Sequence, residues 1–223
     1  MAPIPAWCMY QFIISCYVDG EDETWESGYS LGESLRAQMY MFVIPLLLGL
    51  TFAGASAFTT AYSKRWGERG GQMATIILRN LLGIPLMFIG FILAWLAPAS
   101  LVFNPSKVTL VLGWFLIVAG SIPVMWGHLV LGWRTHMPSV RDTLVRHGLY
   151  AHVRHPIYSG GMVTLAGFAL LRPTLAFVLA CALGSGWLIV QARLEEIDLL
   201  QRLPAYREYM EQVPRFVPRL WRR

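Results

Sequence analysis

The chain has 223 residues, of which 56% are hydrophobic and only 14% are charged, and its formal net charge is +5. A soluble domain normally carries about 25% charged residues. The composition therefore excludes an ordinary soluble globular domain and indicates a membrane protein.

The few charges leave five long apolar stretches. A helix that crosses a bilayer needs about 17 to 25 mainly apolar residues. We expect transmembrane helices at 38–60, 76–97, 108–131, 156–171 and 173–191. A soluble chain of this length cannot hide five such helices in its core. The predicted fold is therefore all-α: a polytopic membrane helical bundle of about five transmembrane helices, with a short helical C-terminal cap in the cytosol.

An acidic arm precedes the first predicted span. Its apolar segment Ala6–Val18 is short, lacks a basic start and runs directly into acidic residues, so we expect no cleavable signal peptide. We interpret 1–36 as an extracytoplasmic or interfacial arm and 37–223 as one membrane domain. The cysteines have no metal-site spacing and no even disulfide framework, so no metal is expected, and pairing of Cys8 with Cys16 stays open.

The loops between the predicted spans alternate in charge. The loop after 38–60 is basic, and so is the segment before 156–171, which carries Arg134, Arg141, Arg146 and Arg154 against Asp142. Basic loops stay cytoplasmic. The alternation predicts an N-terminus outside and a C-terminus in the cytoplasm, and we place the protein in a bacterial inner membrane.

The last two predicted spans form a tight helical hairpin. Pro173 cannot continue a helix without losing a hydrogen bond and clashing with the preceding turn. Small residues would let the backbones of the two helices pack closely. These residues are Gly160, Gly161, Gly167, Gly184 and Gly186.

Polar and ionisable residues gather in two segments, 141–158 before the hairpin and 193–218 after it. A hairpin returns its two ends to the same membrane face. We therefore expect these segments to be neighbours at the cytoplasmic side, where they would form a site.

The run Arg154-His155-Pro156 marks the start of a helix in the first segment. Proline is well tolerated in a first helical turn, and the free N–H groups and the dipole at a helix start favour an anion. A ligand carboxylate suits this place. A snorkelling Arg154 and a capping His155 would also explain the pair.

Glu195 and Glu196 directly follow the last apolar span. A solvated helix end would explain them. An acidic group near the bilayer is nevertheless costly unless it faces a polar cavity or a partner. Arg154, or the positive charge of a bound cofactor, would be such a partner.

These two segments resemble the core motifs of isoprenylcysteine carboxyl methyltransferases, and of the wider membrane group that includes phospholipid N-methyltransferases and bacterial thiol methyltransferases. The residues that carry the resemblance in the first segment are His147-Gly148-Leu149-Tyr150, Arg154-His155-Pro156, Tyr158 and Gly160. Those in the second are Leu194-Glu195-Glu196, Leu199, Tyr206, Tyr209, Val213-Pro214 and Pro218. The resemblance covers 141–219, about a third of the chain.

The resemblance implies a cofactor, S-adenosyl-L-methionine, in a cytosolic-side pocket, with a lipophilic or small acceptor that enters from the bilayer. Carried over by position, the cofactor contacts fall on Asp142, Thr143, Leu144, Val145, Tyr150, His155, Pro156, Ile157, Tyr158 and Glu195. Arg154, Glu196 and Tyr158 are the expected catalytic residues. Membrane lipids are expected neighbours, and nucleic acid is not an expected partner. No glycine-rich dinucleotide fingerprint is present.

Two departures bear on the acceptor and the cap. In isoprenylcysteine enzymes an arginine one turn before the first glutamate binds the substrate carboxylate, and Gln191 stands there in this chain. Leu203-Pro204 replaces the usual Phe-Gly before the first tyrosine. The run from Leu194 to Leu199 is also similar to methanethiol-type S-methyltransferases. A thiol must first lose its proton, for which His147, His152 or Tyr158 would serve.

Two other functions stay open. A sterol-type membrane reductase that uses NADPH shares an Arg-His-Pro-x-Tyr element, but it carries a basic segment where this chain has Glu195 and Glu196. A non-catalytic membrane scaffold of the same fold would be marked by loss of His155, Tyr158 or Glu195, and all three are present.

Overall fold

The computed structural model describes residues 26–135 and 139–219. The chain divides into two units, Met1–Gln38 and Met39–Arg223. Cys8, Cys16 and most of the acidic arm lie outside the described residues. The second unit holds every residue of the predicted site.

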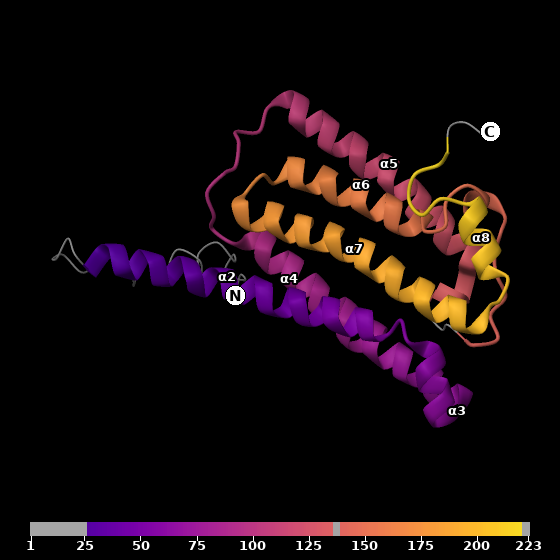
Figure 1. The fold of residues 1–223 in the computed structure, drawn as a ribbon. Coiled ribbons are helices and arrows are strands. Elements are labelled where there is room, and N and C mark those ends of the chain that lie inside the picture. The colour runs from indigo at the N-terminus through magenta and orange to yellow at the C-terminus, as the bar shows by residue number, and fades with distance from the viewer. Residues whose placement is uncertain (1–25, 136–138, 220–223) are drawn as a thin grey trace, which may run out of the picture. The chain divides into compact units, whose positions relative to one another are not determined.

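The described chain is helical, which confirms the predicted fold class (Figure 1). An isolated antiparallel bridge between Leu101 and Thr174 is its one β feature within 26–135 and 139–219. The α-helices are α2 (Glu26–Ala55), α3 (Thr59–Ile76), α4 (Ile84–Leu96), α5 (Lys107–Leu131), α6 (Pro156–Leu171), α7 (Leu175–Arg202) and α8 (Tyr206–Gln212). A π-helix, η1 (Ile77–Gly83), joins α3 to α4, and two 3-10 turns, η2 (Gly132–Thr135) and η3 (Gly148–Ala151), lie between α5 and α6.

Within the described residues, three helical stretches are long and apolar enough to cross a membrane. They are Thr59–Leu96, Lys107–Leu131 and Leu175–Arg202. Met39–Ala55 and Pro156–Leu171 are apolar but shorter. Large apolar side chains are exposed along α5, among them Val108, Phe115 and Leu129, as expected of a helix that faces lipid. The chain is thus a membrane protein, and the number of five spans stays a prediction.

The segment expected as a basic loop after the first span is helical. Residues Thr59–Ile76 form α3, in which Gly67 has φ 74° and breaks the helix. This left-handed conformation costs glycine little and reverses the chain. A Cβ at Gly71 would lie 2.6 Å from the backbone nitrogen of Ser63, which shows how closely the two arms approach.

The core of this unit lies between the second half of α2, α4 and α7. Phe42, Leu46 and Leu50 of α2 pack with Ala94 of α4 and with residues Ala176, Phe177, Ala180 and Cys181 of α7. Figure 1 shows α4 running back alongside this part of α2. A Cβ at Gly90 would lie 2.7 Å from the backbone nitrogen of Leu46, so small residues allow the two helices to approach.

Gly160 and Gly167 of α6 pack against α5, whereas Gly161 of α6 faces Leu188 of α7. A Cβ at Gly160 would lie 2.4 Å from the carbonyl oxygen of Gly120, and one at Gly167 would lie 2.6 Å from that of Gly113. Gly184 of α7 faces Phe91 of α4, and Gly186 has open space around its Cβ position. The expected glycine contacts between α6 and α7 are therefore present at Gly161 and at Gly184, which also faces Leu165 of α6, whereas Gly160 and Gly167 make the close backbone approach to α5.

Helix α7 continues past its predicted end at 191 as far as Arg202. Residues 192–202 hold good helix formers, and Arg202 pairs with Asp198 one turn earlier at 3.2 Å. Asp198 also accepts a hydrogen bond from the backbone N–H of Thr60 at 2.8 Å. Glu195 and Glu196 therefore lie on a rigid, partly buried helix and not in a solvated tail.

Candidate active site

A cavity of about 920 Å³ lies inside the second unit. Its wall is built by residues of α2, η1, α4, α5, α6 and α7 and by the segment between α5 and α6. Small-molecule sites typically occupy about 300–1,000 Å³. The cavity is at the upper end of that range and has room for a cofactor and an acceptor together.

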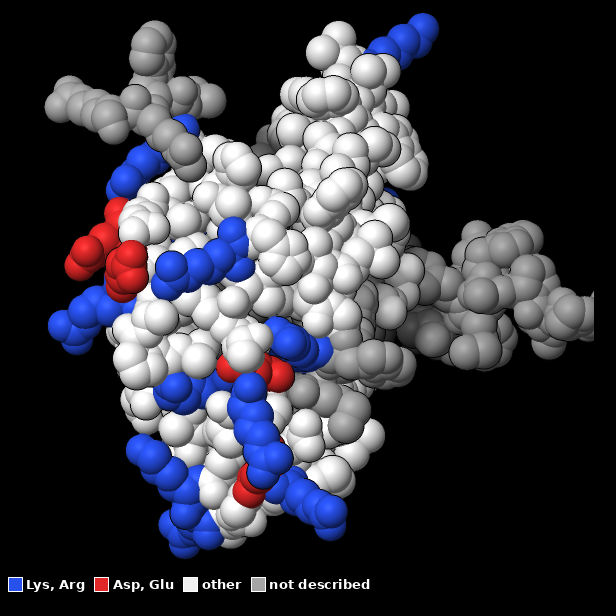
Figure 2. All heavy atoms as spheres, turned by 90° about the vertical axis from the view of Figure 1, so that its right-hand side faces the viewer, with Lys and Arg blue, Asp and Glu red and all other residues white. Residues whose placement is uncertain are grey.

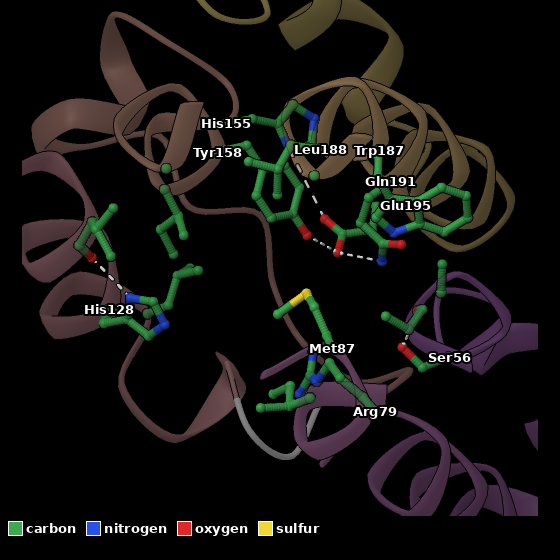
Figure 3. Close-up of a pocket in the computed structure, with 18 of the residues that line it drawn as sticks. Ser56, Arg79, Met87, His128, His155, Tyr158, Trp187, Leu188, Gln191 and Glu195 are labelled. Carbon is green, nitrogen blue, oxygen red and sulfur yellow. Dashed lines mark hydrogen bonds and ion pairs between the residues drawn. The ribbon is translucent and has the colours of Figure 1, made fainter. Parts of the chain in front are cut away.

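Glu195 points into this cavity and is held by two side chains (Figure 3). The hydroxyl of Tyr158, on α6, donates a hydrogen bond to Glu195 Oε1. The amide of Gln191 donates to the same oxygen at 3.2 Å, from one turn earlier on α7. The Tyr158 ring stacks on His155 with centroids 5.5 Å apart. The carboxylate is thereby fixed in direction before any ligand binds.

Glu196 lies at the centre of a buried ionic cluster. Arg215 binds it through Nη2 at 2.6 Å, Arg154 through Nη2 at 3.3 Å and His155 through Nε2 at 3.2 Å. Hydrogen bonding to Glu196 raises the pKa of the Arg215 guanidinium. Only 3% of Glu196 is exposed, and it is not part of the cavity wall. The cluster ties α7 to the start of α6 and to the C-terminal segment.

The C-terminal segment covers the start of α6. The backbone N–H of Arg154 donates to the carbonyl oxygen of Pro214 at 2.9 Å. The backbone N–H of His155 donates to the carbonyl oxygen of Arg215 at 3.1 Å. The Ser159 hydroxyl donates to the carbonyl of Phe216 at 2.7 Å. Carbonyls of the chain therefore occupy the amides of Arg154 and His155, so these two amides do not receive a ligand carboxylate, and the expectation for the first turn of α6 itself stays a prediction.

Three tyrosines close the cavity beside this cluster: Tyr150, Tyr206 and Tyr209. The Tyr209 hydroxyl donates to the carbonyl oxygen of Tyr150 at 2.5 Å. Burial raises the pKa of Tyr209 to about 12 and raises that of Tyr150 as well. Both phenols are therefore neutral at physiological pH. Arg146 donates to the carbonyl of Ala205 at 2.7 Å and so holds α8 against this segment.

Residues 142–145 form a further part of the wall. Asp142 accepts a hydrogen bond from the backbone N–H of Ser139 at 2.8 Å, and Arg134 reaches the carbonyl of Thr143 at 3.3 Å. Arg202 of α7 donates to the carbonyl of Ser139 at 2.8 Å. These contacts hold the loop against the end of α7.

The structure brings most of the predicted site residues to this one cavity. Its wall includes Asp142, Thr143, Leu144, Val145, Tyr150, Arg154, His155, Ile157, Tyr158 and Glu195, whereas Pro156 and Glu196 lie outside it. His147 and His152, considered as bases for a thiol, are exposed and are not part of the wall.

Several residues of the cavity wall that were not predicted from the sequence lie before residue 108. Arg79, Asn80 and Met87 line the cavity from η1 and α4, and His128 lines it from α5. A signal was present, since Arg79 is the only charged residue between positions 70 and 106. A charge inside an apolar helix usually marks a functional site. Arg79 falls inside the predicted span 76–97 and was not predicted as a residue of the site.

Comparison with known proteins supports the same region. Residues 108–204 match the family described as phospholipid methyltransferase. The resemblance to this membrane methyltransferase group is thereby confirmed. The matched segment begins with α5 and ends after α7, so it contains Tyr158, Gln191 and Glu195 but neither Arg79 nor Arg215.

One curated relative is the cobalt-zinc-cadmium resistance protein CzcN of Cupriavidus metallidurans. It is 26% identical over 153 residues, which cover 65% of this chain and 66% of that protein. The chain therefore spans just under two thirds of that relative's length. No solved structure matches the chain. Within 26–135 and 139–219, no group of three His, Cys, Asp or Glu side chains is placed to hold a metal ion.

Proposed function

We propose that the protein is an S-adenosylmethionine-dependent methyltransferase that acts on an acceptor held in the same cavity. The observation that carries the proposal is the fixed carboxylate of Glu195, which faces the cavity from within the segment that matches the methyltransferase family. S-adenosylmethionine carries a positive sulfonium and a positive ammonium group, and a negatively charged carboxylate attracts both.

The residues of the cavity fit this cofactor. Glu195 would balance its positive charge, and the buried Oε1 of Gln191, which has no hydrogen-bond partner among the described residues, is an acceptor for a ligand N–H or O–H. Tyr150, Tyr206 and residues 142–145 would enclose the adenosine part. When bound, S-adenosylmethionine supplies an electrophilic methyl group, whose bond to sulfur breaks as the acceptor's lone pair forms the new bond to carbon.

The side chains contribute mainly by positioning and by excluding water. Tyr158 and Gln191 hold Glu195, and the cluster around Glu196 holds the C-terminal segment over the helix start. We therefore assign Arg154 and Glu196 a positioning role, and keep Tyr158 and Glu195 as groups that contact the cofactor.

Between the two acceptor chemistries, a carboxylate fits the cavity better than a thiol. A carboxylate is already ionised and needs no base. A thiol needs one, and His147 and His152 point to solvent while the Tyr158 hydroxyl is engaged with Glu195.

We further propose that the cavity opens to the cytoplasm of a bacterium, with the N-terminus outside. Figure 2 shows Lys and Arg side chains gathered on the face of the second unit formed by α3, α8 and the C-terminal end of α7. Such a face is expected on the cytoplasmic side of a membrane.

Calorimetry on the detergent-purified protein tests the proposed cofactor. We expect S-adenosylhomocysteine to bind and NADPH not to bind. Glu195→Gln should weaken S-adenosylhomocysteine about 10- to 100-fold, the usual worth of a hydrogen bond to a charged group. Glu211→Gln, on the exposed face of α8, is the matched control and should change nothing. NADPH binding without S-adenosylhomocysteine binding would reject the proposal in favour of a reductase, and binding of neither would favour a scaffold.

A further inference from the structure

Arg79 is the feature of the cavity that the cofactor leaves unexplained. It lies in the π-helix η1, inside the stretch Thr59–Leu96 that is apolar enough to cross a membrane. π-Helical segments are rare and occur frequently at functional sites. The residue also lies outside the part of the chain that matches the methyltransferase family.

Within 26–135 and 139–219, no carboxylate forms an ion pair with the Arg79 guanidinium, and Glu195 acts on it only from across the cavity. The Nε of Arg79 donates to the amide oxygen of Asn80 at 3.3 Å, while its Nη2 is buried and has no hydrogen-bond partner among the described residues. Figure 3 shows Arg79 and Glu195 on facing sides of the cavity. A buried cation is costly unless it is paired. The cavity therefore has a vacant position for an anion opposite the carboxylate that faces the cofactor.

An apolar slot continues from Arg79 along α4. Its wall holds Phe88, Phe91, Ile92 and Trp95, together with Phe177 of α7, whose ring centroid is 4.9 Å from that of Trp95. Trp95 follows Arg79 by 16 residues, so at about 1.5 Å per residue the lining residues from Arg79 to Trp95 extend over roughly 24 Å of helix. Phe88 and Ile92 are more than half exposed, which leaves the slot accessible from the side of the helix that faces lipid.

We propose that Arg79 binds the anionic head of a long-chain amphiphile and that the α4 slot holds its chain. The inference rests on the proposed function, because this amphiphile is the methyl acceptor. It narrows the acceptors that the sequence left open. A simple long-chain amine without a phosphate would meet a guanidinium of its own charge, and a small thiol would leave the slot empty.

The test compares ligands that differ only in head charge or chain length. The full chain in dilute non-ionic detergent is equilibrated with radiolabelled hexadecanoate, with and without saturating S-adenosylhomocysteine. Unlabelled hexadecanoate, hexadecanol, hexadecyltrimethylammonium and butyrate then compete. We expect hexadecanoate to compete at least about tenfold better than hexadecanol, the worth of one charge-assisted hydrogen bond. The cation and butyrate should compete weakly.

Arg79→Gln should reduce the preference for hexadecanoate over hexadecanol to within about twofold, and Arg79→Lys should keep part of it. Arg69→Gln, an exposed arginine of α3, is the matched control and should keep all of it. Unchanged S-adenosylhomocysteine affinity in Arg79→Gln shows that the variant is folded.

Two results would overturn the inference. One is equal competition by hexadecanoate and hexadecanol in the wild type. The other is loss of S-adenosylhomocysteine binding in both Arg79 variants with the hexadecanoate preference intact, which would place Arg79 on the cofactor. Failure of S-adenosylhomocysteine to bind the wild type would reject the proposed function alone, because the hexadecanoate measurement is also made without it.

Discussion

The buried Glu196 and the partly exposed Arg215 form an ion pair, 2.6 Å between Oε2 and Nη2, that fixes the C-terminal segment to α7. The adjacent Glu195 faces the cavity and takes no part in this pair. Two neighbouring carboxylates of one helix thus have different surroundings. One supports the structure of the site and the other is presented to a ligand.

Glu196→Gln should therefore destabilise the protein more than it alters the cavity. The substitution leaves Arg154 and Arg215 without their shared carboxylate, and breaking a buried ion pair by removing one partner costs about 3–5 kcal/mol. We expect a large fall in the thermal unfolding temperature in detergent. Glu195→Gln, whose side chain borders the cavity, should leave that temperature nearly unchanged.

The pair of variants separates positioning from binding. Glu196→Gln protein that still folds at low temperature should bind S-adenosylhomocysteine with affinity close to that of the wild type. A stable Glu196→Gln protein that has lost this binding would instead place Glu196 in contact with the cofactor.

This division between Glu195 and Glu196 could not be predicted from the sequence. The proximity of 141–158 and 193–218 followed from the reversal of the chain at Pro173, and contacts such as Arg154 to Glu196 confirm it. Adjacent residues on a helix point about 100° apart, however. Which of them faces the cavity depends on the rotation of α7, which is fixed by distant contacts such as that between Thr60 and Asp198.

The close backbone approach of α6 to α5 was not predicted, for a similar reason. A glycine in a helix allows another helix to approach closely, but the glycine alone does not indicate which neighbouring helix does so. Gly160 and Gly167 recur at a spacing of seven residues, and so do Gly113, Gly120 and Gly127 of α5. In the structure Gly160 faces Gly120 and Gly167 faces Gly113. The glycine spacing within α6 alone is compatible with packing against either neighbouring helix.

Gly160→Ala should destabilise the packing of α6 on α5. The new Cβ would lie 2.4 Å from the carbonyl oxygen of Gly120, a backbone atom that cannot move without shifting a helix. Overpacking of this kind typically costs about 1–3 kcal/mol. We expect a lower thermal unfolding temperature in detergent.

Gly186→Ala is the matched control, because no atom lies within 4 Å of its Cβ position. It should leave the unfolding temperature unchanged or raise it slightly, since alanine is the better helix former. Equal effects of the two substitutions would contradict the observed contact between α5 and α6.

The proposed orientation in the membrane predicts which introduced cysteines a membrane-impermeant thiol reagent can reach. Asn104 lies between α4 and α5 and Glu211 lies on α8, and both side chains are exposed. In a background without the native cysteines, Asn104→Cys should be labelled in cells whose inner membrane is intact. Glu211→Cys should be labelled only after that membrane is permeabilised, because the basic face that includes α8 is expected in the cytoplasm. Gly148 is a poorer labelling site, because its φ of 61° strains any other residue. Labelling of Glu211→Cys but not Asn104→Cys in intact cells would reverse the orientation and place the cavity on the outer side.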